Sequence, residues 1–170
     1  IEEQKKGKSA DPNKLAQYHN MQINLKIALN SAYGALGNQW FRFYDVRNAE
    51  AVSVAGQLSI RWAERAVNEY LNKVLETDGR DYVIASDTDS LYVTLDSLVQ
   101  KVGLEDKDKI INFMDTVCDG KIQDVIDECY GELAEYVNAF QQKMVMKREV
   151  LADVGIWTGK KHYILNVHNS

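Results

Sequence analysis

The chain has 170 residues, of which 45% are hydrophobic and 26% charged, so its composition is that of an ordinary globular domain or of part of a larger one. Its formal net charge of −5 argues against a protein that coats nucleic acid indiscriminately, although a local site can carry the opposite charge. Since no run of about 20 apolar residues is present, we expect no membrane segment and a soluble, cytoplasmic protein. The start at Ile1 and the strand-like last residues favour a piece of a longer polypeptide.

Two long helices are predicted in the first half of the chain. Residues 1–11 are polar, and the only proline, Pro12, follows Asp11 in the order of an N-cap and a first helical residue. A helix is therefore predicted over 12–36, where apolar residues recur at three- and four-residue steps. A second helix is predicted over 48–75, with small residues in its first turns and apolar core positions later.

Residues 82–94 predict a hairpin with an acidic tip. Two β-prone stretches flank an Asp-Thr-Asp-Ser corner that holds Asp87 and Asp89 facing one space. Like charges so close repel, and a bound cation removes that cost. Oxygen ligands suit Mg²⁺, which takes one or two carboxylates together with substrate phosphates. The alternatives are a solvated turn without a ligand and the Asp-x-Asp motif of a metal-dependent glycosyltransferase.

The second half predicts further helices. A short helix is expected near 96–102, and a long or broken helix over 107–140, where an apolar stripe predicts core packing. Cys118 and Cys129 lie eleven residues apart in this helix, or about 16 Å at 1.5 Å per residue. That separation is too large for a disulfide, so both are predicted to be reduced thiols.

Two strands complete the prediction. Alternating residues predict strands over 143–150 and 162–167, joined through Gly155 and Gly159. The order helix, helix, hairpin, helix, strand, strand indicates an α+β fold with a largely antiparallel sheet.

Three separated motifs resemble the family B DNA polymerases, especially the bacteriophage replicative members. The Lys-x-x-x-Asn-Ser-x-Tyr-Gly pattern of their fingers helix occurs at 26–34, the palm's Asp-Thr-Asp-Ser at 87–90, and the Lys-Lys-x-Tyr primer motif at 160–163. The motifs stand in the family's order. The resemblance implies a palm-type antiparallel sheet with packed helices and a long protruding fingers helix, with 1–37 as part of the fingers and 38–170 as a partial palm.

The first motif implies a nucleotide-binding helix. At helical spacing Lys26, Asn30, Tyr33 and Gly34 share one face. The resemblance implies that Lys26 pairs with the incoming triphosphate and takes part in catalysis. It also implies that Asn30 and Tyr33 press on the nascent base pair, beside room left by Gly34. The plain alternatives are a solvated lysine and a core tyrosine.

The second motif implies a magnesium site with two ions. The resemblance makes Asp89 a direct ligand, while Asp87 binds through water or shapes the turn, and both count as catalytic. In two-metal phosphoryl transfer one ion activates the primer 3′-hydroxyl and the other holds the triphosphate. Glu149 resembles the family's acidic residue beside the metals, although a paired surface glutamate explains it equally well.

The third motif implies primer contacts by Lys160, Lys161 and Tyr163, which would read duplex shape more than sequence. An exposed lysine hairpin is the alternative. His162 fills the motif's variable position, so it is not assigned a catalytic role.

The family's first palm motif, which begins with an Asp that bridges both metals, is absent from the sequence. We therefore expect a fragment of a DNA-directed DNA polymerase that is inactive alone. Its partners would be primer-template DNA, deoxynucleoside triphosphates and the missing segments (exonuclease, first palm motif and thumb), in the host cytoplasm if viral. A duplex-binding remnant without catalysis is the alternative; the glycosyltransferase alternative leaves the other two motifs unexplained.

Overall fold

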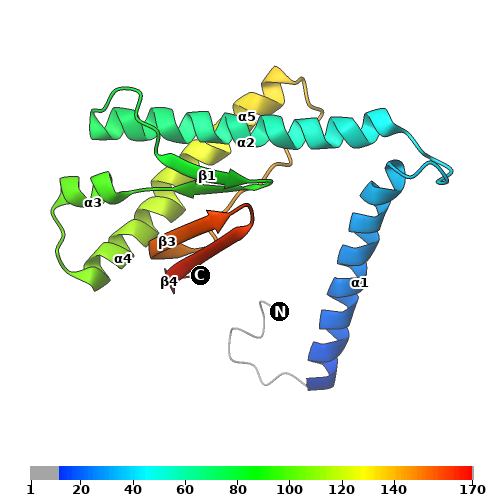
Figure 1. Ribbon diagram of the computed structural model, residues 1–170, viewed down its shortest axis with the longest axis horizontal. Coiled ribbons are helices and arrows are strands. Elements are labelled where there is room, and N and C mark those ends of the chain that lie inside the picture. The colour runs from blue at the N-terminus through cyan, green and yellow to red at the C-terminus, as the bar shows by residue number, and fades with distance from the viewer. Residues whose placement is uncertain (1–11, 170) are drawn as a thin grey trace. The chain divides into compact units, whose positions relative to one another are not determined.

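The computed structural model describes residues 12–169, which form an α+β protein (Figure 1). The predicted N-cap, Asp11, lies outside the described residues. The chain divides between Val54 and Ala55 into two compact units. The elements, in chain order, are α1 (Pro12–Leu36), α2 (Val46–Leu75), β1 (Val83–Asp87), β2 (Ser90–Val93), α3 (Asp96–Val102), α4 (Lys107–Val117), η1 (Cys118–Ile122), α5 (Gln123–Tyr136), β3 (Leu151–Gly159) and β4 (His162–Asn169).

The first unit joins α1 to the start of α2. The predicted helix over 12–36 is confirmed, and the second helix begins at Val46, two residues before its predicted start. Asp45 explains this start, because its carboxylate accepts a hydrogen bond from the Arg47 backbone N–H at 3.0 Å, in the manner of an N-cap. The Asp45 carboxylate also pairs with the Arg47 guanidinium at 3.1 Å, and these two contacts lower its pKa.

The core of the second unit lies between α2, the β1–β2 hairpin, η1 and α5. Tyr82 is fully buried just before β1, and its hydroxyl lies 2.8 Å from Oγ1 of Thr77. The Asn68 side chain accepts the backbone N–H of Tyr82 at 2.8 Å. The cluster of buried residues comprises Ala63, Val67, Leu71, Tyr82, Val83, Ile122, Ile126, Cys129, Tyr130 and Leu133.

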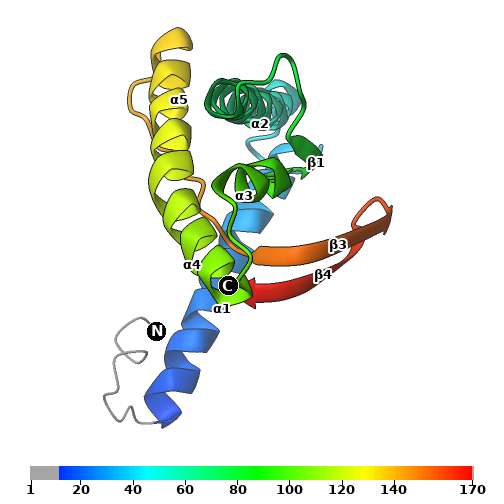
Figure 2. The same ribbon diagram turned by 90° about the vertical axis from the view of Figure 1, so that its left-hand side faces the viewer.

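The sequence predicted a long or broken helix over 107–140, and the structure shows a broken one. A π-turn, η1, separates α4 from α5, and α5 ends at Tyr136, before the predicted end. Figure 2 shows these three elements as one bent rod from which the β3–β4 hairpin extends. Cys118 and Cys129 are free thiols, as predicted, and burial raises the pKa of Cys129 to about 11.

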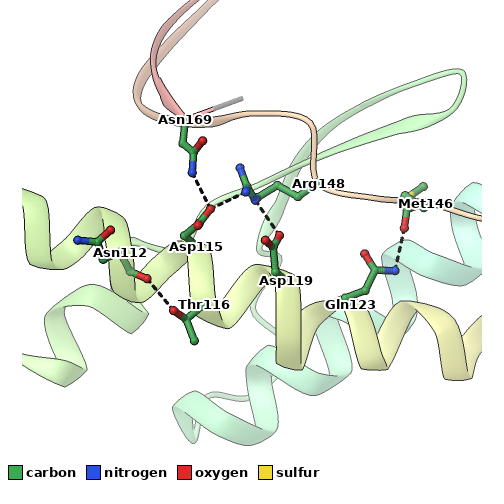
Figure 3. A network of polar contacts seen from close by, with 8 residues as sticks. All are labelled: Asn112, Asp115, Thr116, Asp119, Gln123, Met146, Arg148 and Asn169. Carbon is green, nitrogen blue, oxygen red and sulfur yellow. Dashed lines mark hydrogen bonds and ion pairs between the residues drawn. The ribbon is translucent and has the colours of Figure 1, made fainter. Parts of the chain in front are cut away.

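The predicted strand over 143–150 is wrong. This segment forms no strand, and side-chain bonds hold it to the helical rod (Figure 3). The Gln123 side chain donates to the backbone oxygen of Met146 at 2.8 Å. Arg148 pairs with Asp115 at 2.5 Å and with Asp119 at 3.0 Å. The strand begins only at Leu151, so the alternating residues 143–150 are not part of a hydrogen-bonded sheet.

The strands form two separate two-stranded antiparallel sheets, β1–β2 and β3–β4. The predicted strand over 162–167 is confirmed within β4. The prediction that Gly155 joins the last two strands is wrong, because Gly155 lies inside β3 and pairs with Leu165. The turn is made by Lys160 and Lys161, directly after Gly159.

Candidate functional site

The acidic corner is the turn of the β1–β2 hairpin, as predicted. Asp87 ends β1 and pairs with Ser90, and Thr88 and Asp89 form the turn between them. Thr88 has φ +54°, a conformation uncommon outside glycine. The turn is held by local hydrogen bonds: the Asp89 backbone N–H donates to the Asp87 backbone oxygen at 2.6 Å, and the Ser90 hydroxyl donates to the same oxygen at 3.1 Å. The backbone thus holds both aspartates in one tight turn.

The two carboxylates differ in their surroundings. Asp87 is half-buried, and its Oδ1 accepts a hydrogen bond from the Thr88 hydroxyl at 3.0 Å. Asp89 is exposed, and within residues 12–169 its carboxylate accepts no hydrogen bond and forms no ion pair. Glu149 is exposed in the segment before β3, and no contact joins it to either aspartate in the described part of the chain. In that part, no three His, Cys, Asp or Glu side chains form a group that could hold a metal ion.

The second site element is the turn of the β3–β4 hairpin. Lys160 and Lys161 are exposed there and form no ion pair among the described residues, and Lys161 has φ +63°. Tyr163 follows at the start of β4, where it pairs across the hairpin with Trp157. Both lysines are therefore available to an anionic partner.

An aromatic cluster joins the two hairpins. The ring of Tyr92, from β2, lies 5.4 Å between centroids from Trp157 and 5.4 Å from Tyr163. Trp157 and Tyr163 lie 6.4 Å apart. A hydrogen bond with Tyr163, followed by burial, raises the pKa of Tyr92. The structure thus brings together the β1–β2 hairpin, here called the acidic hairpin, and the β3–β4 hairpin, here called the lysine hairpin. Trp157 follows Tyr92 by 65 residues in the sequence.

Tyr92 and Trp157 were not identified from the sequence. The signal for Tyr92 was its alternation with Ser90, which places both on one face of β2. No local pattern could connect Tyr92 to Trp157, because the two belong to different hairpins.

The first predicted motif, the fingers-helix pattern at 26–34, lies in the first unit, on α1. Lys26, Asn30, Tyr33 and Gly34 all fall inside this helix, so their spacing places them on one face. Lys26 is exposed, and an added Cβ at Gly34 would have no atom within 4 Å. The Tyr33 hydroxyl lies 2.6 Å from Oγ of Ser53, on α2.

Comparison with known proteins decides the family. The model of DNA polymerase family B matches residues 3–126. The chain is 45% identical over 157 residues to a DNA-directed DNA polymerase of Escherichia phage RB69, and 43% identical over 159 residues to a DNA-directed DNA polymerase of Enterobacteria phage T4. The chain belongs to DNA polymerase family B.

The alignments cover 86% and 87% of this family B chain, but only 17% and 18% of the two phage polymerases. The chain therefore spans less than one fifth of these relatives. The family match confirms the resemblance drawn from the three motifs and removes the glycosyltransferase alternative. The matched residues 3–126 include the helix motif and the acidic hairpin, while the lysine hairpin lies beyond them. Within residues 12–169, no helix combines the length and the apolar character that crossing a membrane requires.

Proposed function

We propose that this family B chain carries part of the nucleotidyl-transfer site of a DNA-directed DNA polymerase, which adds deoxynucleotides to a primer 3′-end under the direction of a template. The observation that carries the proposal is the contact of the acidic hairpin with the lysine hairpin through Tyr92, Trp157 and Tyr163. A polymerase must hold a primer end beside its metal-binding carboxylates, and this contact brings together one group suited to each task.

Asp89 and Asp87 are the residues that would hold Mg²⁺. Two carboxylates fit an ion that takes one or two of them and completes its shell with water and substrate phosphates. When bound, the ions neutralise the triphosphate and activate the primer 3′-hydroxyl. Asp89 is the better candidate for a direct ligand, because its exposed carboxylate is free of internal hydrogen bonds in the described chain, whereas Asp87 accepts one from Thr88. Glu149 is a lesser candidate, because no contact among residues 12–169 joins it to the pair.

The α1 face would bind the incoming nucleotide. Lys26 is an exposed cation that can pair with the triphosphate, and Asn30 and Tyr33 lie one and two turns further along the same face. The bond of the Tyr33 hydroxyl to Ser53 limits the positions that the Tyr33 ring can take. In this proposal residues 1–37 belong to the fingers and residues 38–170 to the palm.

Lys160 and Lys161 would contact the phosphates of the primer, with Tyr163 beside them at the start of β4. Exposed lysines at a turn supply sequence-independent affinity, which a polymerase needs because it must accept any primer. The missing exonuclease, first palm motif and thumb would be supplied by further polypeptide. The isolated chain would then be inactive.

Primer extension tests the proposal. The chain is assayed with Mg²⁺, a primer-template and all four deoxynucleotides, alone and mixed with a polypeptide that supplies the remaining polymerase segments. We expect extension only in the mixture, and no extension when the chain carries Asp89→Asn. Duplex binding without extension in the mixture would instead favour the non-catalytic remnant.

A further inference from the structure

Tyr92 links the two hairpins of the proposed site. Both ring contacts that join the acidic hairpin to the lysine hairpin in the described chain go through this one side chain. We propose that Tyr92 is a positioning residue that holds the lysine hairpin against the hairpin of Asp87 and Asp89. Resting on the proposed function, this inference adds that Tyr92 sets where the primer end lies relative to the metal-binding carboxylates.

The register of β1–β2 places Tyr92 on the side of the carboxylates. Asp87 pairs with Ser90 and Ala85 pairs with Tyr92, so these residues occupy one face of the two-stranded sheet. Leu91 and Val93, which flank Tyr92 in β2, pack instead against the core. Tyr92 therefore stands on a rigidly backed strand, beside the proposed metal site.

The lysine hairpin is fixed at its base by polar bonds. The Asn169 side chain, at the end of β4, donates to Asp115 at 2.8 Å, and Arg148, just before β3, pairs with the same carboxylate at 2.5 Å (Figure 3). Lys107 and His168 lie 2.9 Å from the carboxylate of Asp153. These contacts anchor the end of the hairpin that is far from its turn.

The end of the lysine hairpin near its turn is supported by ring contacts with Tyr92. A two-stranded hairpin is at best marginally stable by itself, so a hairpin held only at its base can bend. Trp157 and Tyr163 are paired across the hairpin close to its turn, and both rings contact Tyr92. Tyr92 is thus placed to stop the lysines from moving relative to the aspartates.

Hydrogen exchange on the 170-residue chain tests this positioning directly. We expect Tyr92→Ala to speed amide exchange in residues 156–164 by about tenfold or more, since a local opening becomes easier. Exchange at the anchored base, near Leu151, should stay unchanged. Tyr92→Phe should restore slow exchange because it keeps both ring contacts. A matched control is Val93→Ala, whose side chain faces the core. Unchanged exchange in Tyr92→Ala overturns the inference, whatever the activity.

Kinetics of the mixed polymerase then test the consequence for the primer. We expect Tyr92→Ala to lower kcat by about tenfold or more, because a misplaced primer end slows the chemical step, while KM for the deoxynucleotide stays unchanged. Primer-template affinity should fall no further in the Tyr92→Ala, Lys161→Ala double variant than in Lys161→Ala. Additive losses would overturn the positioning role. An inactive mixture with the unmutated chain would instead overturn the proposed function, and the exchange result would still decide on Tyr92.

Discussion

The indole ring of Trp157 lies over Gly155, two residues earlier in β3. A Cβ placed on Gly155 would stand 2.6 Å from Cη2 and Cζ3 of that ring and 2.9 Å from Cδ2 of Leu165. Glycine inside a strand often marks such a close approach. Because residue 155 has no side chain, the Trp157 ring can occupy this space while it contacts Tyr92.

We therefore expect Gly155→Ala to destabilise the chain by about 1–3 kcal/mol, the usual cost of forcing an extra methyl group into a packed site. Urea denaturation measures this change. Gly131→Ala is the matched control, because Gly131 lies in α5 with no atom within 4 Å of an added Cβ. That control should stabilise the helix by about 0.5–1 kcal/mol. Equal midpoints for Gly155→Ala and the unmutated chain would show that Trp157 is not seated on Gly155.

Removing Arg148 should release the segment before β3. Its side chain is only 18% exposed and pairs with both Asp115 and Asp119, so Arg148→Met leaves two carboxylates without their cation. We expect a loss of about 1–3 kcal/mol in the free energy of unfolding. Arg65→Met is the control, since Arg65 and Glu69 form a pair that is 80% and 65% exposed. An exposed pair at this spacing contributes about 0.5 kcal/mol at most. Similar losses in the two variants would contradict the prediction.

Stability at low pH should depend on Asp153. The hydrogen bond from Lys107, followed by the one from His168, holds the pKa of the Asp153 carboxyl well below its ordinary value of 3.8. The folded state therefore binds this proton less readily than the unfolded state. The resulting stabilisation is complete above pH 3.8 and is lost as the pH falls toward the lower folded pKa.

The pH dependence of the urea midpoint checks this. Asp153→Asn should be less stable than the unmutated chain above about pH 4, and the difference should shrink as the pH falls from 4 toward 2. Glu128→Gln, at an exposed position on α5, serves as the control and should leave the profile unchanged. A difference between Asp153→Asn and the unmutated chain that is constant with pH would rule out this role of the ionised carboxylate.

Cys129 should react slowly with alkylating reagents. Burial, together with the charges of Glu132 and Asp127, raises its pKa to about 11 from an ordinary value of 9.0. At pH 9 about half of an unfolded thiol is ionised but only about 1% of the folded one, so iodoacetamide should react about 50-fold more slowly. The measurement uses a Cys118→Ser variant, with and without urea. Equal rates in both conditions would mean that Cys129 is not buried.

Local patterns predicted most of the helices and the acidic hairpin. The apolar steps of α1 and α2 and the alternation around Asp87 are local features of the sequence, so their elements lie where expected, although apolar residues of α1 such as Leu25 and Leu29 are exposed. The apolar stripe continues through η1, so the sequence did not indicate where the long helix breaks.

Long-range contacts account for what the sequence could not predict. Arg148 is held by Asp115, 33 residues earlier, so the segment around it follows the helical rod and forms no ladder. Of its apolar residues only Met146 packs against the core, since Val145 is 73% exposed and Met144 42% exposed. The site has the same character: its motifs were identified in the sequence, whereas Tyr92 and Trp157 meet only after folding.

The measurement that tests the proposed site most directly is primer extension by a chimeric polymerase, in which this chain replaces the matching segment of the phage RB69 polymerase. We expect the chimera to extend primers and Asp89→Asn to lower kcat by at least about 100-fold, with primer-template affinity largely kept, since in the proposed site the exposed Asp89 carboxylate would hold the metal and not the DNA. Glu128→Gln is the matched loss of one surface carboxylate and should leave kcat unchanged. An Asp89→Asn chimera that extends primers at the unmutated rate would contradict the metal-binding role of this turn.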